Sequence, residues 1–261
     1  MQIKPKKRLG QSFLIDPNIK RKIISACGLS QKDTVLEIGS GRGELTKLIA
    51  ESAGSVLAVE IDTSLTEILK NNLIAYPNVK IINRDILKLD LSKLPVKFGK
   101  KLKVIGNIPY YISTPIIEYL LKYRKRVDSI HLTVQKEYAR RLVALPGGAD
   151  YGSLSCFLQY HSSPEILFYI KRSCFFPAPR VDSAFVRLTL KPNWQANPEK
   201  EKLLFKVIRA AFNQRRKTLR NSLKDTIPAQ KLEQFFKKYS LDRNIRPEKL
   251  SLTDFSRLTN N

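Results

Sequence analysis

The chain has 261 residues, of which 47 are Lys or Arg and 23 are Asp or Glu, so its formal net charge is +24. This excess lies along the whole chain, which predicts a polyanionic partner and favours nucleic acid over a membrane surface. The 43% hydrophobic content suffices for a core. The sequence contains no run of about 18 apolar residues, so we expect no membrane span. Three scattered cysteines and two histidines argue against a zinc site, and so few cysteines favour a reducing, cytoplasmic setting.

Short apolar runs alternate with amphipathic segments through the first two thirds of the chain. In chain order we expect a helix over 17–28, a strand over 34–38, a helix over 44–52, a strand over 55–60, a helix over 63–75, strands over 79–82 and 102–105, a helix over 115–123, and strands over 130–134, 165–170 and 184–190. This alternation predicts an α/β fold in which helices cover both faces of a parallel sheet.

The C-terminal part has a different pattern. The stretch 191–198 is polar and contains two prolines, which is typical of a linker. Only helical patterning follows it. We therefore expect two domains, one over residues 1–191 and a small helical one over 192–261.

One amphipathic helix is expected around 204–224. Its apolar side carries Arg215, which we expect to anchor a domain interface. Its polar side carries Lys206, Arg209, Asn213, Arg216, Lys217, Arg220 and Lys224. A charge run is usually only a solvated helix face, but no acid interrupts this one before Asp225. We therefore favour phosphate contact and predict RNA binding by four of these residues: Arg209, Arg216, Lys217 and Arg220.

A glycine-rich turn, Gly39-x-Gly41-x-Gly43, separates the first predicted strand from its helix. Small residues there let the backbone approach a ligand, and the helix N-terminus offers free N–H groups. Glu60 ends the next strand, 21 positions after Gly39, where an acid can accept hydrogen bonds from ribose hydroxyls. Asp85 follows the third strand and could accept from an adenine amino group. Together these residues predict a nucleoside-containing cofactor.

The glycine spacing argues against a dinucleotide. The dinucleotide fingerprint is Gly-x-Gly-x-x-Gly, but position 44 is Glu. Glu37 would also repel a pyrophosphate placed on this turn. A cationic ligand such as S-adenosylmethionine fits the acids better.

The tetrapeptide Asn107-Ile108-Pro109-Tyr110 follows another predicted strand end. It could be an ordinary proline-containing turn. The residue types also suit a flat ring that bears an amine: the Asn carbonyl oxygen accepts from N–H groups, Pro109 fixes the backbone, and Tyr110 offers a face for stacking.

These motifs together resemble those of the ribosomal RNA adenine N6,N6-dimethyltransferase family, over almost the full length of the chain. The matching stretches are residues 7–14, 37–43, 107–110, 175–183 and 212–219, with Glu60 and Asp85. The last two stretches resemble the bacterial small-subunit enzyme more than its large-subunit relatives. One departure is Ser12, where Asn is frequent in the family motif.

The resemblance implies a Rossmann-like class I methyltransferase domain that uses S-adenosylmethionine, releases S-adenosylhomocysteine and needs no metal. The implied cofactor-binding residues are Ser12, Leu14, Gly39, Gly41, Glu60, Ile61, Asp85, Ile86 and Asn107. The implied catalytic residues are Asn107, Ile108, Pro109, Tyr110 and Phe175, with Phe175 closing one side of the target base. The implied reaction is N6,N6-dimethylation of two adjacent adenines in the 3′-terminal hairpin loop of small-subunit (16S) rRNA. It is coupled to assembly of the small subunit. The oligomeric state is open, with a monomer as the default expectation.

Two alternatives stay open at this point. A DNA adenine N6-methyltransferase would share the catalytic motif, but only about 70 C-terminal residues are available for a target-recognition domain. A non-catalytic nucleic-acid-binding assembly factor could share the fold, but the site residues form a complete catalytic set.

Overall fold

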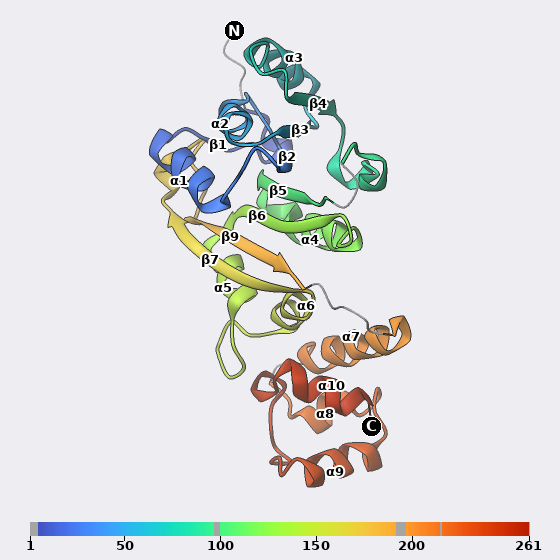
Figure 1. The fold of residues 1–261 in the computed structure, drawn as a ribbon. Helices are drawn as coiled ribbons and strands as arrows, with labels where there is room; N and C mark the ends of the chain where they lie inside the picture. Colours follow the sequence, from blue (N-terminus) through green and yellow to red (C-terminus); the bar gives the residue numbers. More distant parts are fainter. Residues whose placement is uncertain (1–4, 97–99, 192–196, 215, 261) are drawn as a thin grey trace. The chain divides into compact units, whose positions relative to one another are not determined.

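The computed structural model describes residues 5–96, 100–191, 197–214 and 216–260 (Figure 1). Its helices are α1 (Pro17–Cys27), α2 (Glu44–Ser52), α3 (Thr63–Asn72), α4 (Ser113–Lys122), α5 (Lys136–Val143), α6 (Ser153–His161), α7 (Pro198–Phe212), α8 (Leu219–Leu223), α9 (Ala229–Lys238) and α10 (Leu252–Asn260). Its strands are β1 (Phe13–Leu14), β2 (Thr34–Ile38), β3 (Ser55–Glu60), β4 (Val79–Asn83), β5 (Leu102–Asn107), β6 (Val127–Gln135), β7 (Ser162–Ile170), β8 (Phe175–Phe176) and β9 (Ser183–Leu190).

The main sheet has the strand order β4-β3-β2-β5-β6-β9-β7 (Figure 1). Strands β2 to β6 are parallel to their neighbours, whereas β9 pairs with β6 in antiparallel fashion. The expected parallel sheet is present in β2 to β6, and the antiparallel β9, which was not expected, makes the whole sheet mixed. The central strands β2, β3 and β5 are buried almost throughout, which explains their unbroken apolar runs, because helices exclude water from both faces.

Most predicted elements are present, with small differences at their ends. Helix α1 begins after Asp16, whose side chain accepts hydrogen bonds from two backbone N–H groups, and ends at Gly28 in the left-handed conformation. Helix α3 ends at Asn72, three residues earlier than expected, and Leu73 caps it. Helices α5 and α6, which lie between β6 and β7, were not predicted.

A second, two-stranded sheet lies outside the main sheet. Strand β1 near the N-terminus pairs with β8, more than 160 positions later in the chain, in antiparallel register. This pairing fixes the N-terminal segment against the chain that precedes β9. In the part of the chain that the structure describes, no helix is long and apolar enough to cross a membrane.

The chain divides into two compact units. One consists of the residues up to Ala139 together with Glu165–Leu190 and contains most of the main sheet. The other consists of Arg140–Pro164 and the residues from Lys191 onward. The predicted boundary near 192 falls close to the third and last point at which the chain passes from one unit to the other, whereas the contribution of 140–164 to the helical unit was not expected. The predicted linker lies mostly in 192–196, outside the described residues.

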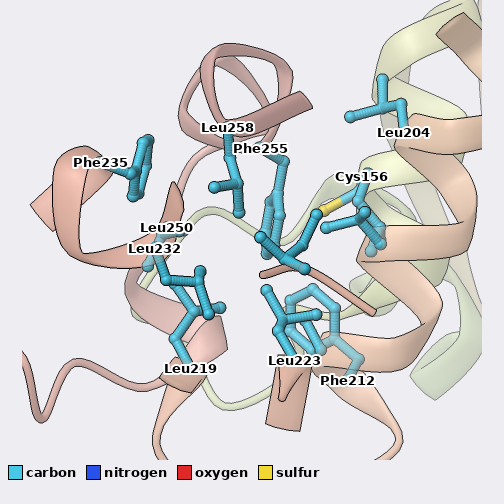
Figure 2. Close-up of a cluster of buried hydrophobic side chains, with 14 of the residues drawn as sticks. Cys156, Leu204, Phe212, Leu219, Leu223, Leu232, Phe235, Leu250, Phe255 and Leu258 are labelled. Carbon is cyan, nitrogen blue, oxygen red and sulfur yellow. The ribbon is translucent and has the colours of Figure 1, made fainter. Parts of the chain in front are cut away.

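The helical unit has its own apolar core. Figure 2 shows the part of this core that α7, α8 and α10 build together with Cys156 from α6. Leu219, Leu223, Phe255 and Leu258 are fully buried in it. Because this core joins side chains from α6 with side chains from the C-terminal helices, residues 153–161 belong to this unit by packing, although they precede β7 in sequence.

The helix predicted around 204–224 is two helices. Helix α7 ends at Phe212, and Thr218 begins α8 by accepting a hydrogen bond from the backbone N–H of Asn221. The predicted division of this stretch into an apolar face and a basic face is nevertheless confirmed. The basic residues predicted on one face are exposed, and the apolar residues on the other face are buried, namely Leu204, Val207, Ile208, Ala211, Leu219 and Leu223. The spacing of apolar residues did not reveal the break, because the apolar residues of both helices face the same core. Arg215, the expected interface anchor, lies outside the described residues.

Candidate active site

A pocket opens at the carboxyl ends of the central strands of the first unit. Its empty space, with the open solvent at its mouth included, is about 910 Å³. Gly39, Glu60, Asp85 and Asn107 follow or end β2, β3, β4 and β5, and all four line it. The sequence predicted this convergence, because the carboxyl ends of parallel strands meet at one edge of a sheet.

The glycine-rich turn is held in shape by Glu60. Gly39, Gly41 and Gly43 all have positive φ, which other residues adopt only with strain. One Glu60 carboxylate oxygen accepts a hydrogen bond from the Gly41 N–H and the other accepts from the Asp62 N–H, both at 2.9 Å. Burial raises the pKa of Glu60, and these two backbone donors oppose that effect. Glu60 therefore lines the pocket and also ties the turn to the end of β3.

The N-terminal segment is fastened beside the same strand end. Asp62 accepts hydrogen bonds from Lys6 Nζ at 2.6 Å and from Gln11 Nε2 at 2.9 Å. Burial raises the pKa of Asp62, but hydrogen bonds from Lys6, Ser64 and Gln11 outweigh it and lower the pKa to about 2. The sequence alone did not predict these hydrogen bonds. An Asp before a helix indicates only a cap, and nothing in the local sequence points to Lys6, which lies 56 positions away.

Asn107 is held in one orientation. Its side-chain Nδ2 donates a hydrogen bond to the Ser12 carbonyl oxygen at 2.9 Å. Since Nδ2 is used in this way, Oδ1 is the atom left to accept hydrogen bonds from a ligand. Ile108, Pro109 and Tyr110 line the pocket next to it. The Tyr110 hydroxyl lies 2.5 Å from Ser183 Oγ, and this contact fixes the ring in place.

The remaining predicted cofactor residues are distributed over two adjoining pockets. Ser12, Ile61, Asp85 and Ile86 line the main pocket. Leu14 lines a smaller neighbouring pocket, which shares Gly39, Gly41 and Asn107 with the main one. One Asp85 carboxylate oxygen caps a short helical turn by accepting from the Leu87 N–H at 3.0 Å.

Phe175 is the one predicted catalytic residue that does not line the main pocket. It is only 3% exposed and packs in the core of the first unit with Leu14 and Ile23. It lines neither pocket. Its role beside the target base stays a prediction.

Glu37 is a buried acid behind the glycine-rich turn. Its Oε2 accepts a hydrogen bond from Thr46 Oγ1 at 2.6 Å. Burial raises the pKa of Glu37 to about 7, although the Thr46 hydrogen bond opposes this change. The Glu37 carboxyl therefore binds its proton more tightly in the folded protein than in the unfolded chain.

This raised pKa predicts a pH-dependent stability. As pH rises from about 4.5 to about 7, the contribution of Glu37 to the free energy of unfolding should fall by about 3 kcal/mol. Glu37→Gln should remove this dependence, so its melting temperature should fall less than that of the wild type between pH 5 and pH 8. Thermal melts of the cofactor-free protein measure this difference, and Glu67→Gln, at an exposed position on α3, should follow the wild type. Parallel wild-type and Glu37→Gln curves would contradict the assignment.

The predicted RNA-binding residues lie in the helical unit. Arg209, Arg216, Lys217 and Arg220 are all exposed. Arg220 is partly engaged already, because its guanidinium lies 3.5 Å from a Glu233 carboxylate oxygen. Arg216 and Lys217 lie in the turn between α7 and α8. Among the described residues, no cluster of three or more His, Cys, Asp or Glu side chains could hold a metal ion.

Comparison with known proteins is consistent with this site. The family model described as ribosomal RNA adenine dimethylase matches residues 2–261. The chain is 44% identical to a ribosomal RNA small subunit methyltransferase A from Alkaliphilus oremlandii, covering 100% of this chain and 92% of the relative. It is 43% identical to the protein of the same name from Lachnoclostridium phytofermentans, covering 97% and 89%.

Solved structures share the fold. A dimethyladenosine transferase from Plasmodium falciparum matches with a TM-score of 0.82 and 27% identity, covering 94% of this chain and 95% of that one. The 23S rRNA methyltransferase ErmE matches with a TM-score of 0.74 and 24% identity, covering 95% and 100%. The latter likeness concerns the fold alone.

Proposed function

We propose a specific reaction for this chain, which belongs to the ribosomal RNA adenine dimethylase family and is an S-adenosylmethionine-dependent rRNA adenine dimethyltransferase. The proposed substrate is the pair of adjacent adenines in the 3′-terminal hairpin loop of small-subunit rRNA, and both N6 atoms receive two methyl groups. The observation that carries the chemistry is the fixed amide of Asn107, whose free oxygen belongs to the lining of the pocket.

The described residues fit the cofactor. Left-handed glycines let the backbone approach it closely, and Glu60 and Asp85 offer acceptors for ribose hydroxyls and an adenine amino group. Ser12, Ile61 and Ile86 supply further lining. When bound, S-adenosylmethionine supplies an electrophilic methyl group on a sulfonium ion. The acids of the pocket complement its positive charge.

The residues at the end of β5 prepare the target amine. The lone pair of adenine N6 is delocalised into the ring, so the amine is a poor nucleophile. Asn107 Oδ1 and the Ile108 carbonyl oxygen accept its two hydrogens and draw the lone pair out of conjugation. Tyr110 stacks on the base. Catalysis is then mainly positioning and electrostatics, and the proton leaves to water after transfer.

The target adenine must be unpaired to reach this pocket. A hairpin loop satisfies that condition, whereas a base inside a duplex must first be extruded. The names of the curated relatives favour small-subunit rRNA over other RNA. We therefore propose that the assembling small subunit presents the loop, and that the enzyme acts on it as a monomer.

The first test is transfer of labelled methyl groups from S-adenosylmethionine to unmethylated small ribosomal subunits, naked rRNA and duplex DNA. We expect label in the subunits, recovered as N6,N6-dimethyladenosine and lost with Asn107→Ala. Label in DNA alone would overturn the substrate. No label anywhere, with cofactor and RNA both bound, would favour a non-catalytic assembly factor.

The turn between α7 and α8 is a proposed phosphate contact. Reversing both charges there, with Arg216→Glu and Lys217→Glu, should weaken RNA binding and reduce the slope of log affinity against log salt by about 1.5. Fluorescence titrations at several salt concentrations measure this slope. Lys70→Glu with Lys80→Glu makes the same charge change at exposed sites of the first unit and should leave the slope nearly unchanged. Equal slopes for both double variants would remove this turn from the interface.

A further inference from the structure

The register of the small sheet separates two adjacent phenylalanines. Phe175 is opposite Leu14, and both are buried in the core of the first unit. Phe176 is opposite Phe13 and is 58% exposed. Because successive strand residues point to opposite sides, the same two residues of β8 present one ring to the core and one to solvent.

Phe176 lies close to the mouth of the pocket. Its partner Phe13 lines the pocket, and residues directly opposite each other in an antiparallel pair project to the same side. The next residue, Pro177, accepts a hydrogen bond from Ser12 Oγ at 2.8 Å. The Ser12 carbonyl in turn holds the Asn107 amide. Phe176 is thus connected to the Asn107 amide through two residues, Pro177 and Ser12.

A second exposed ring directly follows the motif at residues 107–110. Tyr111 is 65% exposed and lines the pocket. It packs so closely on Gly10 that a Cβ atom there would lie 3.1 Å from the ring. Gly10 and Phe13 are three residues apart, a distance of at most about 11 Å along the chain. Two solvent-facing rings therefore lie near the Asn107 motif, Tyr111 in the lining of the pocket and Phe176 opposite Phe13 of that lining.

The loop around β8 is also basic. Lys171, Arg172 and Arg180 are exposed, and none of them forms a salt bridge within the described part of the chain. The one acid between positions 171 and 182 is Asp182, whose carboxylate accepts a hydrogen bond from the Arg172 N–H. Unpaired cations beside exposed aromatic rings are typical of surfaces that bind single-stranded nucleic acid.

We propose that Phe176 stacks on an unpaired nucleotide that neighbours the target adenosine, with Tyr111 at the same pocket and the three cations near the RNA phosphates. This inference rests on the proposed function. A base that turns into the pocket loses its stacking partners and leaves its neighbours unstacked. An exposed ring at the rim restores part of that stacking, so Phe176 favours the extruded form of the loop.

The test compares Phe176→Ala with the wild type on unmethylated small ribosomal subunits. We expect KM for the subunit to rise roughly tenfold or more, with the affinity for S-adenosylhomocysteine and the melting temperature unchanged. Phe176→Trp should restore KM, because stacking needs only a ring face. Ile74→Ala removes another exposed apolar side chain. Ile74 lies just after α3 and about 100 positions before β8, so this variant should behave as the wild type.

The neighbouring residue supplies a matched control. Phe175→Ala should lower the melting temperature, since it empties part of the core, whereas Phe176→Ala should not. An unchanged KM for Phe176→Ala, measured with an active wild type, would overturn the stacking role alone. An inactive wild type on every RNA would instead overturn the proposed function.

Discussion

Replacing Asn107 by alanine is expected to lower kcat for methyl transfer by roughly 100- to 1000-fold, the range seen when one preorganised polar partner of a reacting group is removed. The affinity for S-adenosylhomocysteine should change by less than tenfold, because Asn107 is one of many residues that line the pocket. Single-turnover rates on small subunits and calorimetric titration of S-adenosylhomocysteine separate the two effects. A kcat within a few-fold of the wild type, with RNA still bound, would remove Asn107 from the chemistry.

Asn107→Asp tests the orientation of the amide. The carboxylate has no N–H to donate, so an oxygen would face the Ser12 carbonyl oxygen where Nδ2 now lies at 2.9 Å from it. Repulsion between these oxygens should displace the N-terminal segment. We therefore expect Asn107→Asp to weaken cofactor binding more than Asn107→Ala does, even though it keeps an acceptor. If Asn107→Asp binds the cofactor as tightly as the wild type, the Ser12 contact does not matter for the pocket.

The parts of the site that the sequence predicted are those set by strand ends. Gly39, Glu60, Asp85 and Asn107 each follow or end a short apolar run, and a parallel sheet brings such positions together whatever the distance in sequence. The expectation needed only the order of strands and helices. It did not need any side-chain pairing between distant segments.

The parts that the sequence did not predict depend on such pairings. Whether Phe175 or Phe176 faces outward depends on the register of β1 with β8, and a shift of one residue would exchange the two rings. The bond between Lys6 and Asp62 likewise joins segments 56 positions apart. The break before Thr218 was hidden because both helices share one core. Local patterns record periodicity, and they do not record which distant partner a residue finds.

Glu60→Ala is expected to have the second large effect, and this effect is on cofactor affinity and not on the rate of methyl transfer. The change removes the acceptor for two backbone N–H groups, those of Gly41 and Asp62, and an unpaired buried donor costs about 1–3 kcal/mol. It also removes the proposed ribose acceptor. We expect the Kd for S-adenosylhomocysteine to rise at least about 100-fold, which corresponds to about 3 kcal/mol.

Glu60→Gln is expected to weaken cofactor binding less than Glu60→Ala does. Glutamine keeps one carbonyl oxygen for one of the two backbone donors but turns an NH2 group toward the other, so its Kd should lie between those of the wild type and Glu60→Ala. Glu67→Ala removes an exposed acid from α3 and should leave the titration unchanged. Because Gly41 needs a left-handed backbone that Glu60 holds in place, Glu60→Ala should also lower the melting temperature of the cofactor-free protein. A variant that loses affinity but keeps its melting temperature would assign Glu60 to the ribose alone.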